Sequence, residues 1–65
     1  MTVKALTRLM NDHGTRPRVK VMRDTGDAAI LIYEGSPMNM DEETASMKVN
    51  SFTVLGVGFL EVHAE

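Results

Sequence analysis

The run Ile30-Leu31-Ile32-Tyr33-Glu34-Gly35 constrains what this chain can fold into more than any other stretch. It contains the longest unbroken series of large apolar and aromatic residues, and Gly35-Ser36-Pro37 closes it with turn-forming residues. Such a run predicts a strand that is buried on both faces, which in a chain of 65 residues means the centre of a sheet. Because side chains alternate along a strand, the two isoleucines are expected on one face, and Leu31 and Tyr33 on the other.

A first hairpin is predicted around this run. Residues 18–23 alternate polar and apolar side chains, which indicates a strand with Val19 and Val21 on its buried face. The following Asp24-Thr25-Gly26-Asp27 has the composition of a turn, because Asp bonds nearby backbone and Gly accepts a positive φ. The chain is therefore expected to reverse into 28–33 as an antiparallel pair.

A second hairpin is predicted from residues 48–54 and 59–63, joined by a turn at 55–58. Alternation places two pairs of side chains on common faces: Phe52 with Val54, and Leu60 with Val62, the latter pair inward. Val49 falls out of step with the third strand. Either a β-bulge shifts the register near Asn50-Ser51, or Val49 belongs to the preceding connection.

Two helices are predicted outside the hairpins. The first has an apolar stripe at helical spacing, formed by Val3, Leu6, Leu9 and Met10. Thr2 can cap its start, and residues 11–14 are expected to end it, with Gly14 in the left-handed conformation. A second, short helix is expected near 40–46, with Asn39 as its cap and acidic residues near its positive end.

These elements predict one α+β domain over residues 1–65. Its sheet is expected to have four antiparallel strands in two hairpins, with the N-terminal helix on one face and a short linker helix. The chain has no cysteine, so the small core must stand alone or be shared with a second copy. The sequence shows no signal peptide and no apolar run of membrane-spanning length, which predicts a cytoplasmic protein that does not enter a membrane.

Short sequence patterns recur in the same order in a known group of proteins. The matching residues are Val3 and Leu6; Leu31, Tyr33, Glu34 and Gly35; Val49, Ser51, Phe52 and Val54; and Leu60, Glu61 and Val62. In these the chain resembles small proteins encoded by phages and prophages of Gram-positive bacteria. It departs from them at 38–41 and at 55–58, where relatives carry other linker and turn residues. The resemblance implies a mobile-element origin and an α+β fold, and it implies no catalytic residue, since the family has no settled activity.

Charge is unevenly distributed along the chain, whose net charge is −2. Residues 1–23 hold six of the seven basic side chains, and residues 24–65 hold eight of the nine acidic ones. We favour the interpretation that the halves fold together and their charges become solvated neighbours. The alternative is a nucleic-acid-binding accessory protein whose basic strand contacts phosphates through Arg16, Arg18, Lys20 and Arg23. Against it, no aromatic residue interleaves with this basic run to stack on bases.

No pattern typical of a catalytic, cofactor or metal site stands out. The chain lacks cysteine and a Gly-x-Ser-x-Gly motif. A metal site built from Asp12, His13 and His63 would require the two ends of the chain to meet, and one built from residues 41–43 with Asp27 lacks the spacing of a calcium loop. Surface histidines and a solvated helix end are the preferred interpretations. We therefore predict a non-enzymatic protein without a cofactor.

The remaining prediction concerns partners. Apolar residues on both faces of 28–33 indicate that something beyond the first helix has to cover this strand. The methionines beside the acidic segment either fill core gaps or form an adaptable contact surface. We predict a protein–protein interaction module, homodimeric or bound to another protein. Its predicted contact surface comprises Leu31, Tyr33, Met38 and Met40.

Overall fold

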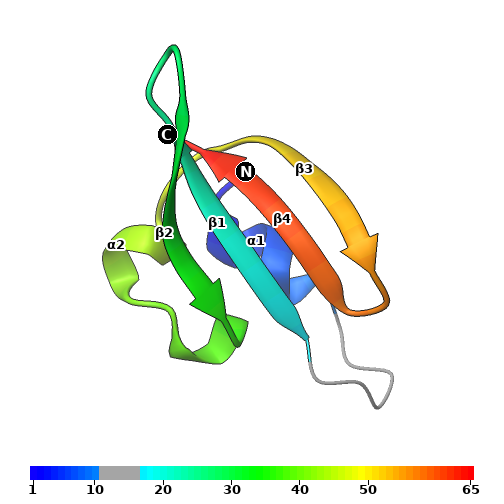
Figure 1. The fold of residues 1–65 in the computed structure, drawn as a ribbon. Coiled ribbons are helices and arrows are strands. Elements are labelled where there is room, and N and C mark those ends of the chain that lie inside the picture. The colour runs from blue at the N-terminus through cyan, green and yellow to red at the C-terminus, as the bar shows by residue number, and fades with distance from the viewer. Residues whose placement is uncertain (11–16) are drawn as a thin grey trace.

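The computed structural model describes residues 1–10 and 17–65, and over these residues it confirms the α+β class. The elements in chain order are α1 (Val3–Arg8), β1 (Arg18–Asp24), β2 (Ala29–Gly35), the 3₁₀ helix η1 (Pro37–Asn39), α2 (Glu42–Ala45), β3 (Val49–Gly56) and β4 (Phe59–Ala64). A single four-stranded sheet forms one layer, and α1 lies against one of its faces (Figure 1). None of these helices has the length and apolar character needed to cross a bilayer.

The strand order is β2-β1-β4-β3, so the two hairpins meet through β1 and β4. Each hairpin is antiparallel, as predicted, but β1 and β4 pair in parallel, from Arg18↔Phe59 to Arg23↔Ala64. The prediction of a purely antiparallel sheet is therefore wrong, and the sheet is mixed. A parallel pair needs a long connection, and here β2, the linker with η1 and α2, and β3 together form it.

β1 and β4 occupy the centre because each buries every second side chain. Val19 and Val21 are fully buried beside Leu60 and Val62, as the alternation predicted. Together with residues of α1 and the end of β4 they form the apolar core. Its members are Val3, Leu6, Val19, Val21, Leu60, Val62 and Ala64. The core thus lies on one face of the sheet, under α1.

β2 is an edge strand, which corrects the prediction that Ile30–Gly35 is the buried centre of the sheet. Its pairing with β1 shifts between Val21↔Tyr33 and Met22↔Leu31, so that Ile32 is an extra residue. Because neighbouring residues of β1 point to opposite faces, Tyr33 lies on the core face and Leu31 on the open face. The bulge therefore separates two side chains that simple alternation placed together.

The helix ends follow local hydrogen-bonding rules. Thr2 caps α1, as predicted, by accepting a hydrogen bond from the backbone N–H of Ala5 at 3.2 Å. α1 ends at Arg8, and Leu9 of the predicted stripe is 71% exposed. The predicted helix end at residues 11–14 lies outside the described residues, with Asp12 and His13.

The cap of the linker helix was predicted two residues too early. Pro37 at the start of η1 and Ser36, whose hydroxyl accepts from the Met38 N–H, place Asn39 inside a 3₁₀ turn. The backbone then extends at Met40, and Asp41 caps α2 by accepting from the Thr44 N–H at 3.4 Å. The short linker helix is thus confirmed, with Asp41 in the role predicted for Asn39.

Candidate interaction surface on strand β3

Two apolar side chains of β3 lie on the core face of the sheet without being covered. Phe52 pairs with Val62, and Val54 pairs with Leu60, so both point to the side on which α1 packs. Phe52 is nevertheless 52% exposed and Val54 68% exposed. Figure 1 shows the reason: α1 lies behind β1 and β4, and β3 extends beyond it at the far edge. The apolar face of the sheet therefore continues past its helix.

The backbone of the same two residues points away from the sheet. Lys48 and Glu65 exchange both backbone hydrogen bonds, at 3.2 and 2.9 Å, which makes them a hydrogen-bonded pair. Such pairs alternate with non-hydrogen-bonded ones along antiparallel strands. Through the observed register, this alternation places Phe52↔Val62 and Val54↔Leu60 in the non-hydrogen-bonded class. The N–H and C=O groups of Phe52 and Val54 consequently face the outer edge of β3.

The N-terminal residues occupy only the beginning of that edge. The backbone C=O of Met1 accepts from the Val49 N–H at 2.9 Å, and Thr2 forms an isolated antiparallel bridge with Lys48. The pairing with β4 then shifts between Val49 and Ser51, which confirms the first of the two alternatives predicted for Val49, a bulge near Asn50-Ser51. Within the described part of the chain, no strand pairs with the outer edge beyond this point. We call Phe52, Val54 and their outward backbone groups the β3 surface.

The β3 surface is also uncharged. Residues 49–56 contain no acidic or basic side chain, and the adjoining Leu55 and Val57 are exposed apolar residues. Natural edge strands are usually protected from pairing by charged side chains, proline or bulges. β3 has bulges near its two ends, between Val49 and Ser51 and between Val54 and Gly56, and a regular stretch at 51–54. The opposite edge, β2, carries Glu34 and a bulge in its middle.

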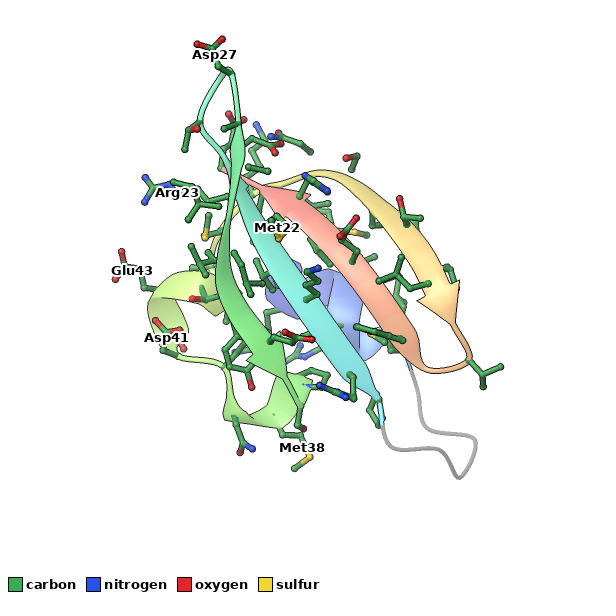
Figure 2. All side chains as sticks on the ribbon, viewed as in Figure 1. Met22, Arg23, Asp27, Met38, Asp41 and Glu43 are labelled. Atoms are coloured by element: carbon green, nitrogen blue, oxygen red, sulfur yellow. The ribbon has the colours of Figure 1, made fainter. Side chains whose placement is uncertain are left out.

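The four residues of the predicted contact surface do not come together as one patch. Leu31 is exposed on the open face, and Met38 on η1 is 90% exposed (Figure 2). Tyr33 and Met40 instead pack against the core. The Tyr33 hydroxyl donates a hydrogen bond to the backbone C=O of Ser36. Core filling thus accounts for Met40 and Tyr33.

The predicted basic strand lies mostly on the open face, where acidic side chains stand between its charges. Arg18 is 3.7 Å from Glu34, and Lys20 is 3.9 Å from Glu61. Arg23 alternates to the core-face side of β1, where it is exposed, and Figure 2 shows it pointing outward beyond β2. Arg16 lies outside the described residues. The described basic side chains therefore do not form a continuous positive surface.

A polar cluster at the other end of the open face joins three strands. His63 lies between Asp24, with Nδ1 to Oδ1 at 3.0 Å, and Glu61, with Nε2 to Oε2 at 3.4 Å. Asn50 donates from Nδ2 to Oδ2 of Asp24 at 3.0 Å. The hydrogen bond with Asp24 is the main cause that raises the pKa of His63, and the bond from Asn50 is the main cause that lowers the pKa of Asp24. No local sequence pattern predicts this cluster, because its members are up to 39 residues apart.

The predicted metal alternatives do not assemble among the described residues. No group of three or more His, Asp and Glu side chains in residues 1–10 and 17–65 has the geometry of a metal site. Figure 2 shows Asp27 at the tip of the β1–β2 turn, well apart from Asp41 and Glu43 beside α2. The alternative metal site of Asp27 with residues 41–43, against which a solvated helix end was preferred, is therefore not assembled.

Comparison of the chain with protein-family models, curated proteins and solved structures found no match.

Proposed function

We propose that this chain is a non-enzymatic protein–protein interaction module that binds through the β3 surface. The observation that carries the proposal is the continuation of the apolar core face onto Phe52 and Val54, which α1 leaves more than half exposed. In strand addition, a partner strand extends the sheet at its edge. This requires backbone groups that can form hydrogen bonds along the edge and side chains that the partner can contact. The β3 surface contains no ionisable side chain, which suits it for contact rather than acid–base chemistry.

The energetic gain from covering the two side chains is modest. Full burial of a Val or Phe side chain contributes about 1.5–3 kcal/mol relative to exposure. Phe52 and Val54 retain half or more of their exposure, so covering both would contribute on the order of 2–3 kcal/mol, with backbone hydrogen bonds in addition. The phage or prophage origin implied by the resemblance is part of the same proposal and awaits the identity of neighbouring genes.

The proposal is tested by photo-crosslinking in cells. A benzoylphenylalanine placed at Val54 should form covalent protein adducts, because this position is exposed at the proposed contact. The matched control places the same residue at Glu43, which is exposed beside α2. A second variant that combines the probe at position 54 with Phe52→Ser should lose most of the adduct. Equal labelling at positions 54 and 43, or no adduct at 54, would contradict the proposal.

Nucleic-acid binding through the basic strand is a separate class of function, and no observation favours it over contact with a protein. Arg18 and Lys20 already lie beside carboxylates on the same face. Phosphate groups would have to compete with Glu34 and Glu61 for these basic side chains. The two carboxylates would also repel the negatively charged backbone of a nucleic acid. A titration of the chain with duplex and single-stranded DNA at low salt distinguishes this class directly.

A further inference from the structure

We infer that the partner of the β3 surface is a second copy of this chain, joined edge to edge through β3 around a two-fold axis at Thr53. The inference rests on the proposed function and names the occupant of that surface. Antiparallel pairing around Thr53 sets Phe52 opposite Val54 of the other copy, and Thr53 opposite its own counterpart. The two sheets then continue into one another, with both α1 helices on the same side.

The alternation of inward-facing and outward-facing backbone groups along β3 agrees with this axis. The outward N–H and C=O groups belong to Phe52 and Val54, the residues on either side of Thr53. Two copies related by the axis therefore present these groups to one another, and the two Phe52–Val54 pairs can exchange about four backbone hydrogen bonds. Thr53 falls in the non-hydrogen-bonded class of the new pairing, in which opposite Cα atoms lie about 4.5 Å apart.

The side chains are self-complementary in the same register. On the core face, each Phe52 meets a Val54, an aromatic–β-branched pair of the kind that stabilises antiparallel strands. On the open face, the two Thr53 hydroxyls meet, and Thr–Thr pairs are also favourable. Because residues 49–56 carry no charge, the chain can approach its own copy without repulsion between like charges at the contact.

The small core supplies a second argument for a second copy. The largest fully buried side chains are valines: Val3, Val19, Val21 and Val62. Domains below about 70–80 residues usually add disulfides, a metal or oligomerisation to so small a core. The sequence has no cysteine, and the described residues form no metal site. Pairing through β3 extends the core with two Phe52 and two Val54 side chains, which lie directly beside Val62 and Leu60.

A single-cysteine cross-link tests the axis. The chain has no natural cysteine, so Thr53→Cys introduces one thiol per copy. Across a non-hydrogen-bonded pair the Cα separation of about 4.5 Å lies within the 4.4–6.8 Å range that a disulfide requires. The control is Ser46→Cys, which places a thiol at another exposed position, at the end of α2. Under mild oxidation Thr53→Cys should form covalent dimers at least about tenfold faster than Ser46→Cys at equal concentration.

A second variant and the sedimentation of the unmodified chain test the same self-pairing independently. Adding Val54→Lys should slow the Thr53→Cys cross-link by about tenfold or more, because a lysine would replace the apolar side chain opposite Phe52 of the other copy, and both copies would bring a positive charge to the same small contact. The unmodified chain should show concentration-dependent sedimentation, with half-association in the micromolar range expected of a small interface. Equal cross-linking rates for the two cysteine variants, together with a strict monomer up to about 1 mM, would overturn the self-pairing.

Failure of the self-pairing is distinguishable from failure of the proposed function. If the probe at Val54 captures a different protein while Thr53→Cys does not dimerise, the second copy is overturned and the interaction module stands. If the probe captures nothing, both are overturned. If it captures the same chain, and the Thr53→Cys dimer forms, both are supported.

Discussion

The imidazole Nδ1 of His63 lies 3.0 Å from Oδ1 of Asp24, a contact that joins β4 to β1 across the middle of the sheet. The second ring nitrogen faces Glu61, so both neighbours are carboxylates that can only accept. Only the protonated ring can donate to both at once. Its raised pKa follows first from the bond with Asp24 and then from the bond with Glu61, against the opposing effect of burial.

The stability of the fold should therefore fall as pH rises above about 6.5. A histidine whose pKa is higher in the folded chain contributes stability that is fully present below about pH 6.5, its unfolded value, and is lost as pH passes the raised folded value. Urea midpoints measured between pH 6 and pH 8 should decline, and His63→Gln should flatten this decline. The measurements belong in a His13→Gln background, so that His63 is the only histidine that titrates. An unchanged slope in His63→Gln would contradict the role of this contact.

At acidic pH, the stability of the fold should depend on pH in the opposite direction and fall as the pH is lowered. Asp24 has a pKa below its ordinary value of 3.8, so its contribution is present above that value and is lost as pH falls through the lower folded value. Asn50→Ala removes the largest cause of this shift and should make the unfolding midpoint less sensitive to acidification below pH 4. A parallel titration of Asn39→Ala, the same substitution at an exposed position of η1 away from Asp24, provides the comparison.

Truncation of the buried Leu60 side chain should strongly lower the free energy of unfolding. Leu60 is buried between β1 and β3 under α1, and Leu60→Ala is expected to cost about 2–5 kcal/mol of unfolding free energy. In a domain of this size that change removes most of the stability. Val57→Ala, at a turn position that is 92% exposed, should change stability by less than about 0.5 kcal/mol. Equal losses by thermal unfolding would contradict the assignment of the core.

Two glycine replacements should have effects of opposite sign. Gly26 has φ of 89° in the β1–β2 turn, and an added Cβ would meet nothing within 4 Å, so its cost is conformational. Gly26→Ala should destabilise the fold by about 1–2 kcal/mol. Gly56 has equal space and no positive φ, so Gly56→Ala should be neutral or stabilising by up to about 1 kcal/mol. Chemical denaturation of both variants at low protein concentration makes the comparison.

The N-cap of α1 offers a test at a single oxygen atom. Thr2→Ala removes the acceptor for the Ala5 N–H and should cost about 0.5–2 kcal/mol. Thr2→Ser keeps the oxygen and should retain most of the stability. Since Thr2 also bridges to Lys48, loss in both variants would indicate that the strand contact, rather than the cap, dominates.

The predictable parts of the fold were those encoded by neighbours in sequence. The buried alternation of Val19 with Val21 and of Leu60 with Val62, the turn around Gly26, the cap at Thr2 and the bulge near Asn50 each depend on a few adjacent residues. The pairing of β1 with β4 depends on residues such as Arg18 and Phe59, which no local pattern connects.

The errors share a physical cause. The apolar run of β2 was predicted to be central because its composition is apolar, yet the cleaner alternation in β1 and β4 was the better indicator of a covered strand. One extra residue at Ile32 then moved Tyr33 to the core face. The exposure of Phe52 and Val54 depends on how far α1 reaches, which the strand sequence does not encode. The predicted contact surface therefore lies on β2 and the linker, whereas the surface that we propose lies on β3.

The parallel pairing of β1 with β4 also has a consequence during protein synthesis. β1 can pair with β2 as soon as the ribosome has released both strands, but the other edge of β1 has no partner until residues 59–64 emerge. Until then, the nascent hairpin exposes the unpaired edge of β1, which carries Val19 and Val21. An unpaired strand edge of this kind can pair with other chains and lead to aggregation. Translation that stalls before β4 should consequently yield aggregating fragments rather than a smaller folded domain.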